Sequence, residues 1–440
     1  MQSAFFAIAD AIPLLLRGDE VFTSHFVGEQ SDFVRFTRGA VRQAGSVQQG
    51  AVTLDLIEGR RHASGTLTLS GDPVADRARL AHLVVELRDL RAQLDEDPYL
   101  LYATTRHSTE CRRSAVLASP ADAVAAVHGI AAGRDLVGIY AAGSVHAGFA
   151  NSFGQRNWFT SENFNLDWSF FHDTDKAVKG AYAGTQWDVS ELQARAALLG
   201  EQLASLGRPA RRIEPGRYGV YLAPAAVWEL LGILGWGGFG LRAHRTKTTP
   251  LLRMIEDGAR LHPDLCLREN TAGGAAPDFQ EAGFLRPDAV TLIEGGAYRD
   301  CLVSPRSAVE YGVATNGASA AESPASLDLA AGTLSRDRVL GELGTGIYVS
   351  NLWYLNFSDR VACRATGMTR FATFWVEGGV IQAPLEVMRF DESIYRILGE
   401  NLVALTSERD FILDPASYFQ RSTDSAHVPG ALVEDFTLTL

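Results

Sequence analysis

The chain has 440 residues, of which 46% are hydrophobic and 21% are charged. This length exceeds that of one ordinary core, so two domains are expected, and the composition excludes global disorder. The net charge of −12 excludes the broad cationic surface that binding to nucleic acid or to an anionic membrane requires.

The cysteines and the apolar segments predict a cytoplasmic protein. Four widely separated cysteines form no C-x-x-C pair, which favours free thiols in a reducing compartment. No apolar run reaches the roughly 18 residues of a membrane span. The apolar residues 1–16 are interrupted by Asp10 and lack both a positive start and a cleavage site, so they predict a first amphipathic helix rather than a signal peptide.

The first half of the chain mixes strand and helix patterns. Apolar and polar residues alternate with the strand period over three stretches, residues 21–50, 53–69 and 136–171. Helical spacing or helix-end signals mark three others, residues 75–94, 119–133 and 190–207. Glu58-Gly59 predicts a turn, and Ser190 with Gln193 predicts a capping box at the start of the third helix. These elements predict an α+β domain over residues 1–208, and the polar, proline-bearing residues 209–216 predict a linker.

The second half is dominated by strand and turn signals. Two Glu-Gly-Gly sequences, at residues 294–296 and 377–379, predict hairpins because β-branched or aromatic residues flank each one. Short helices are expected at residues 336–343 and 391–405, and the glycine-, alanine- and serine-rich residues 315–326 predict a mobile surface loop. The expected fold class is therefore α+β: an N-terminal sheet-and-helix domain, then a β-rich, barrel-like domain over residues 217–440.

Residue patterns alone give no self-contained catalytic site. Residues 235–240 fit G-x-G-x-x-G, but the following LRAHRTKTTP has no amphipathic stripe, so a glycine turn is favoured over a dinucleotide site. The ten histidines are scattered and none forms H-E-x-x-H. His244 and His262 are a weak metal-binding candidate, with a surface or capping role as the alternative.

A family resemblance lies mainly in the last hundred or so residues. The segments that carry it are Leu343–Val349, Trp353–Asp359, Thr366–Arg370, Phe374–Ile381 with Pro384, and Arg389–Ser393. Looser matches lie at residues 36–39 and 151–154. This ordered string resembles the TldD/TldE family, in which TldE is also called PmbA and whose members have also been called modulators of DNA gyrase.

The resemblance implies a degenerate metal site in the apolar segment 227–236. Active TldD-type subunits are zinc peptidases with the motif H-E-x-x-x-H, whose histidines bind zinc and whose glutamate is the general base. Alignment places Trp228 and Ile233 at the two histidines and keeps Glu229. Residues 421–430 contain no counterpart of the family's cysteine ligand. Glu229 is then expected to be a solvated or ion-paired helix residue.

This pattern is similar to the TldE-type subunit, which lacks the metal site and assembles with a TldD-type subunit. The resemblance implies a catalytically silent partner in a heterodimeric zinc metallopeptidase that cleaves peptide or amide bonds of extended or small modified peptides. No cofactor is expected in this chain, because the partner supplies the zinc. Natural-product biosynthesis is one setting, and the chain alone could form a homodimer.

Candidate groove or interface residues come from two parts of the signature. They are Thr345, Gly346, Tyr348, Asn351, Trp353, Tyr354 and Asn356. For Trp353 and Tyr354 a place in the barrel core is an equal alternative. Two other functions stay open: a non-catalytic peptide-binding homodimer, and an enzyme with a different site built from Glu229, His244 or Cys363.

Overall fold

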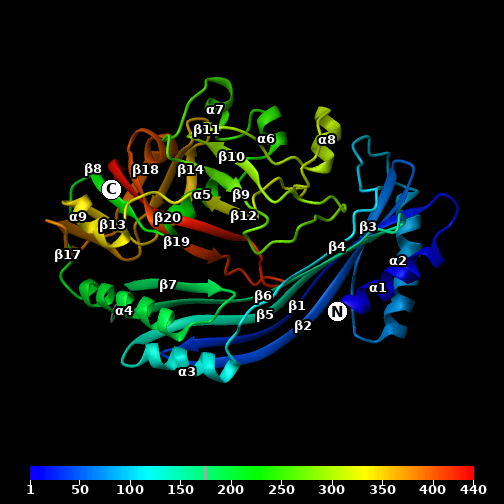
Figure 1. Ribbon diagram of the computed structural model, residues 1–440, viewed down its shortest axis with the longest axis horizontal. Coiled ribbons are helices and arrows are strands. Elements are labelled where there is room, and N and C mark those ends of the chain that lie inside the picture. The colour runs from blue at the N-terminus through cyan, green and yellow to red at the C-terminus, as the bar shows by residue number, and fades with distance from the viewer. Residues whose placement is uncertain (173–175) are drawn as a thin grey trace.

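The computed structural model describes residues 1–172 and 176–440, which form two sheets with helices packed around them (Figure 1). The expected α+β class is confirmed, with a sheet-and-helix first half and a sheet-rich second half. No helix among the described residues is both long enough and apolar enough to cross a membrane.

The N-terminal half contains a sheet of seven strands with the order β3-β2-β1-β5-β6-β4, and β7 pairs with the other end of β6. Its strands are β1 Val21–Thr37, β2 Ala40–Glu58, β3 Arg61–Thr68, β4 Thr109–Arg113, β5 Asp135–Asn151, β6 Arg156–Phe171 and β7 Ala177–Gly184. Its helices are α1 Gln2–Ala11, the 3₁₀ turn η1 Ile12–Leu15, α2 Pro73–Arg91, α3 Pro120–Ala131 and α4 Val189–Leu206.

A tight turn divides the first strand-like stretch, which the sequence pattern did not indicate. Arg38 and Gly39 have φ angles of 53° and 70°, so both adopt the left-handed conformation of a two-residue hairpin turn. β1 and β2 therefore form one long antiparallel hairpin. The expected turn at Glu58-Gly59 is confirmed between β2 and β3.

Helices lie at the two ends of this sheet (Figure 1). α1 and α2 pack near β3, where Phe5, Leu54 and Leu80 belong to one buried cluster. α3 and α4 pack at the other end. Helix α4, the third helix that the helix-end signals predicted, has its N-cap at Asp188 rather than at Ser190. The Asp188 side chain caps the helix by accepting a hydrogen bond from the backbone N–H of Ser190.

The second half forms a branched sheet of thirteen strands. Its strands are β8 Gly216–Leu222, β9 Leu267–Glu269, β10 Val290–Glu294, β11 Ala297–Tyr298, β12 Ser326–Leu329, β13 Gly346–Val349, β14 Trp353–Asp359, β15 Arg364–Met368, β16 Thr373–Glu377, β17 Val380–Pro384, β18 Arg389–Ser393, β19 Leu402–Leu413 and β20 Ser425–Leu438. Its helical elements are α5 Pro224–Gly235, α6 Leu241–Arg245, α7 Leu252–Glu256, α8 Pro305–Tyr311, η2 Arg336–Arg338, α9 Val339–Leu343 and η3 Arg396–Glu400. Among the described strands the two ends of the main path, β11 and β17, do not pair, so the sheet is not a closed barrel.

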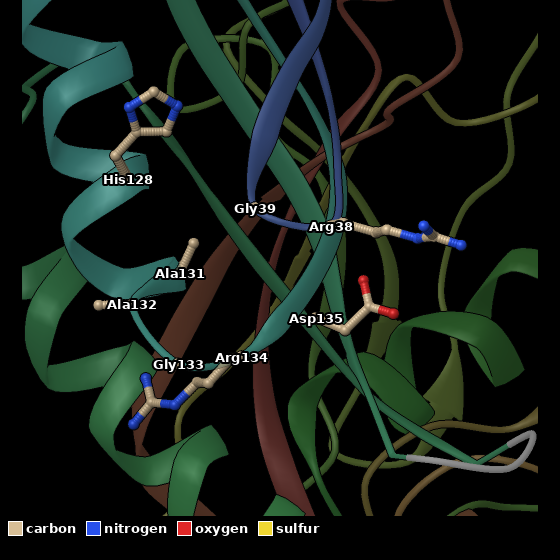
Figure 2. A pocket seen from close by; sticks show the side chains of 8 residues that line it. All are labelled: Arg38, Gly39, His128, Ala131, Ala132, Gly133, Arg134 and Asp135. Carbon is tan, nitrogen blue, oxygen red and sulfur yellow. The ribbon is translucent and has the colours of Figure 1, made fainter.

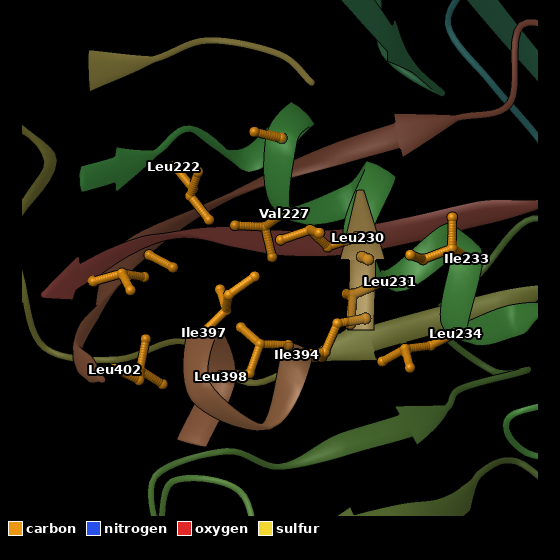
Figure 3. Close-up of a cluster of buried hydrophobic side chains, with 14 of the residues drawn as sticks. Leu222, Val227, Leu230, Leu231, Ile233, Leu234, Ile394, Ile397, Leu398 and Leu402 are labelled. Atoms are coloured by element: carbon orange, nitrogen blue, oxygen red, sulfur yellow. The ribbon is translucent and has the colours of Figure 1, made fainter. Parts of the chain in front are cut away.

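Both Glu-Gly-Gly hairpins are confirmed, as β10–β11 and β16–β17. Each turn has two glycines with positive φ. The core of this half surrounds α5, whose Val227, Leu230 and Leu231 pack against Ile397 and Leu398 (Figure 3).

Two expectations for the second half are wrong. Residues 391–405 are not one helix, because Phe390, Glu392 and Ile394 are buried at the strand period and β18 pairs with β15 before the short turn η3. Residues 315–326 are not a surface loop throughout. Ala318 and Glu322 are buried, and the Glu322 carboxylate accepts hydrogen bonds from neighbouring segments.

Candidate functional site

A cavity of about 690 Å³ lies between the two halves of the chain. From the N-terminal half its walls come from β6, β7 and α4, and from the C-terminal half they come from β8, α5, α9, β13, β17 and β19. A cavity of this size with mixed polar and apolar walls is typical of sites for small molecules or short peptide segments.

Helix α5 places the degenerate metal-site positions beside this cavity. Pro224 begins the helix, where its missing N–H costs no hydrogen bond, and an almost continuous apolar sequence follows. Trp228 and Glu229 are only half-buried and line the cavity. Ile233 is buried in the hydrophobic core instead, with 3% of its surface exposed. The three positions therefore do not face one common space.

Glu229 is half-buried at the cavity wall, and hydrogen bonds hold its carboxylate there. Its carboxylate accepts a hydrogen bond from the backbone N–H of Leu352, and a further one from Asn351. Burial raises the pKa of Glu229 to about 7, because the protein removes water that would solvate the charge, and the hydrogen bonds and the positive charge of Lys179 offset only part of this effect. Near neutral pH this carboxyl group can therefore hold or release a proton inside the cavity.

Charged side chains from both halves meet on the opposite wall. Lys179 Nζ on β7 lies 3.6 Å from Asp167 Oδ2 on β6, and burial raises the pKa of Asp167. Arg195 on α4 lies 3.9 Å from Asp410 on β19, and Arg336 donates to the same carboxylate at 2.8 Å. Of these ion pairs, Arg195–Asp410 connects the two halves of the chain. The sequence did not indicate the Arg195–Asp410 pair, because no local signal links residues more than 200 positions apart.

The predicted groove residues separate into two groups. Tyr348 and Asn351 line the cavity, and the Tyr348 hydroxyl accepts a hydrogen bond of 3.2 Å from Gln202 on α4. Thr345 is exposed and Gly346 is buried, and neither lines the cavity.

The second group lies on β14, outside the cavity. Trp353 and Tyr354 have 38% and 76% of their surfaces exposed, and Asn356 is exposed as well. The alternative that the two aromatic residues belong to a barrel core is therefore wrong. Arg370 stacks on Trp353, with its guanidinium carbon 4.5 Å from the ring centroid.

The other candidate groups have partners elsewhere. Nε2 and Nδ1 of His244 are bonded to the Gly238 carbonyl at 2.8 Å and to the Tyr298 hydroxyl at 2.9 Å, and His262 Nδ1 accepts from the Asp264 backbone. Cys363 is buried, and burial raises the pKa of its thiol.

Residues 235–240 connect α5 to α6 rather than a strand to a helix, which does not fit a dinucleotide site. Among residues 1–172 and 176–440, no three His, Cys, Asp or Glu side chains are grouped to hold a metal ion.

A separate hollow lies at the tip of the β1–β2 hairpin, beside the end of α3. Its volume is about 500 Å³, and its lining includes Arg38, His128, Arg134 and Asp135. Figure 2 shows the side chains of His128, Arg134 and Arg38 pointing in different directions. Because these side chains do not converge on one point, the hollow is a weaker candidate site than the cavity beside α5.

A family match covers the second half of the chain, where the signature residues lie. Residues 215–440 match the PmbA/TldA metallopeptidase C-terminal domain. The chain belongs to the PmbA/TldD family. No curated protein sequence matches it.

Solved structures of family members share the whole fold. TldE from Thermococcus kodakarensis superposes with a TM-score of 0.80 at 13% sequence identity, covering 99% of this chain and 100% of that one. A proposed modulator of DNA gyrase from Thermotoga maritima gives a TM-score of 0.75 at 14% identity, covering 99% and 100%. A similar protein from Bacteroides thetaiotaomicron gives 0.75 at 14% identity, covering 99% and 98%. At these identities the likeness establishes the fold.

Proposed function

We propose that this chain is the catalytically silent, TldE-like subunit of a heterodimeric zinc metallopeptidase in the cytoplasm. The observation that carries the proposal is the chemistry of α5 beside the cavity. Trp228 and Ile233 stand where active TldD-type relatives have zinc-binding histidines, and neither an indole nor an aliphatic side chain ligates zinc.

The residues present do not fit a zinc ion. Of the three aligned positions only Glu229 has a metal-binding atom, and one of its carboxyl oxygens already accepts from the Leu352 backbone N–H. Ile233 lies in the core. In this proposal the metal, the attacking water and the general base all belong to a TldD-like partner, and no reaction step passes through this chain's own α5.

The role proposed for this chain is to shape the compartment and hold the substrate. Tyr348, Asn351 and Lys179 provide hydrogen-bonding groups on the cavity walls, and Trp228 provides an aromatic face. Such a mixed surface suits the amide groups and side chains of an extended or small modified peptide. Cleavage of a peptide or amide bond in a natural-product pathway is the setting we infer.

A second candidate is a non-catalytic homodimer that binds peptides. The observation in its favour is that both walls of the cavity come from one chain, so a ligand could bind without any partner.

The test is to purify this chain alone and after co-expression with a TldD-like subunit that contains H-E-x-x-x-H. Zinc content and hydrolysis of an unstructured peptide are measured for both. We expect stoichiometric zinc and hydrolysis only in the co-purified complex. Zinc or hydrolysis from the single chain would contradict the proposal. Failure to form a complex, together with peptide binding by the single chain, would favour the homodimer.

A further inference from the structure

A second cavity, of about 410 Å³, lies at the β3 end of the N-terminal sheet. Figure 1 shows β3 and β7 at opposite ends of that sheet. One wall of this cavity comes from β1, β2 and β3, and the others come from residues 97–102, 280–282 and 304–306. None of its lining residues lines the cavity beside α5, so the two are separate sites.

Alternation along the strands makes the sheet wall of this cavity polar. Phe22 and Leu54 point to the other face of the sheet, where they are buried in the cluster that includes α1 and α2. Their neighbours Thr23 and Asp55 lie opposite each other on β1 and β2, and Ser64 lies opposite Asp55 on β3. All three line the cavity. Three strands therefore contribute one row of polar side chains.

Two further lining residues have polar atoms without partners within residues 1–172 and 176–440. His25, on β1, is half-buried, and its ring takes part in no hydrogen bond. Burial lowers the pKa of His25, so near pH 7 the neutral ring offers one donor and one acceptor. Gln280 has 2% of its surface exposed, and its amide oxygen accepts from the Ala282 backbone N–H. The amide nitrogen of Gln280 has no partner, and because an unpaired buried donor costs free energy, a ligand acceptor there would be stabilised.

The charges of the cavity disfavour an anionic ligand. Asp55, Asp97 and Glu281 line it, together with the cation Arg306. Arg306 donates to Asp97 at 2.6 Å, and Nδ1 of His62 lies 3.0 Å from the Asp55 carboxylate. Even with His62 protonated, the three carboxylates outnumber the two cations. An anion would meet net negative charge, whereas a hydroxyl group can donate to the remaining lone pairs of these carboxylates.

A ligand rich in hydroxyl groups fits this set of donors and acceptors. Carboxylates only accept, the Gln280 amide nitrogen only donates, and threonine, serine and neutral histidine side chains do both. A hydroxyl group also does both, so it can bond to each of these groups, whereas an ammonium ion could not accept from Gln280. Tyr99 and Tyr102 add aromatic rings to the walls, against which the C–H face of a sugar ring can pack. The volume suits a small-molecule site.

We propose that this second cavity binds an uncharged sugar, whose hydroxyl groups bond to Asp55, His25 and Gln280 while its ring packs against Tyr102. The binding site goes beyond the proposed peptidase role and does not depend on it, because it shares no lining residue with the cavity beside α5.

Saturation-transfer difference NMR of the purified chain tests the ligand class. The probes are D-glucose, D-galactose and D-mannose, each compared with the uronate of the same ring. We expect at least one neutral sugar to bind with a millimolar or lower dissociation constant, and its uronate to bind roughly ten-fold more weakly because of the carboxylates. Binding of none of the three neutral sugars would overturn the proposal. So would a uronate that binds as tightly as its neutral counterpart.

Three variants test the location. Gln280→Leu removes the unpaired donor and should weaken binding about five-fold. The matched control is Gln202→Leu, because Gln202 is also buried with an unpaired amide atom but lines the cavity beside α5. This control should leave the affinity for the sugar unchanged. Ser64→Trp, at an exposed strand position, should keep the circular dichroism of the wild type and abolish binding by filling the cavity.

Weaker binding with Gln202→Leu and not with Gln280→Leu would place the sugar in the other cavity and overturn the proposal. Unchanged binding by a folded Ser64→Trp variant would overturn it as well. Loss of zinc or hydrolysis in the complex with a TldD-like subunit would bear on the proposed function and not on this site.

Discussion

The Glu229 carboxyl group should make the fold less stable as the pH rises. Its pKa increases from an ordinary value of 4.5 to about 7 on folding. Below pH 4.5 both the folded and the unfolded state are protonated at this position. Between pH 4.5 and about 7 the unfolded chain releases the proton while the folded chain keeps it, so the free energy of unfolding decreases with rising pH. Each pKa unit corresponds to about 1.36 kcal/mol, so the destabilisation reaches roughly 3 kcal/mol above pH 7.

Glu229→Gln should remove this dependence. The amide oxygen of glutamine can still accept from the Leu352 N–H, but the side chain never ionises. We expect the variant to be more stable than the wild type by about 1–3 kcal/mol at pH 8 and nearly equal to it at pH 4.5. Urea denaturation at both pH values measures the difference. The matched control is Glu201→Gln, an exposed residue of the same cavity wall, which should change little at either pH.

The reasoning would be refuted if Glu229→Gln changed stability equally at pH 4.5 and pH 8, or destabilised the chain at pH 8. Either result would mean that the carboxylate is stabilised in the folded state by more than the hydrogen bonds and the Lys179 charge described above.

Four further predictions concern other residues of the chain. Hydrogen bonding to the Asp55 carboxylate raises the pKa of His62. The stabilisation that this contact gives the folded state should be present below pH 6.5 and be lost as the pH rises through the folded pKa. His62→Gln should therefore cost about 1 kcal/mol at pH 6 and less at pH 9 in urea denaturation. Arg421→Ala leaves buried oxygens of the N-terminal sheet without a donor and should cost about 3 kcal/mol by the same assay, with faster proteolysis of the surrounding loop as a second readout. Ile233→His places an imidazole in the core and should cost about 2–4 kcal/mol without adding bound zinc, measured by denaturation and by metal analysis. In the reconstituted complex Asn351→Ala should raise KM about five-fold through loss of one hydrogen bond, while Asn356→Ala, outside the cavity, should leave KM unchanged.

Several helix starts and hairpin turns were predictable because their signals are local, whereas the Arg38-Gly39 turn and the Asp188 cap were missed. Ser119-Pro120 does cap and begin α3, and both Glu-Gly-Gly turns do form hairpins. Local signals also misled where pairing with a distant strand decides the structure. Asp391-Glu392 looks like a helix start, yet it lies in β18 because β15 pairs with it.

The candidate site was predictable only in part. The resemblance singled out the segment that forms α5 and named Asn351 and Tyr348 as groove or interface candidates, and the cavity is lined by these two residues and by part of α5. The resemblance could not distinguish these cavity-lining residues from Trp353. Tyr348 on β13 lines the cavity, whereas Trp353 on the next strand, β14, is exposed outside it. The half-buried state of Glu229 also depends on contacts with a segment more than 100 residues away.

Hydrolysis by the reconstituted complex, with one glutamate removed at a time, tests the proposed division of labour most directly. One complex carries Glu229→Gln in this chain, and the other carries the same change in the H-E-x-x-x-H motif of the TldD-like subunit. We predict that the first complex keeps zinc and kcat close to wild type, while the second keeps zinc and loses hydrolysis. Loss of hydrolysis with Glu229→Gln, with zinc and assembly intact, would show that this chain takes part in the chemistry and would contradict its assignment as the silent subunit.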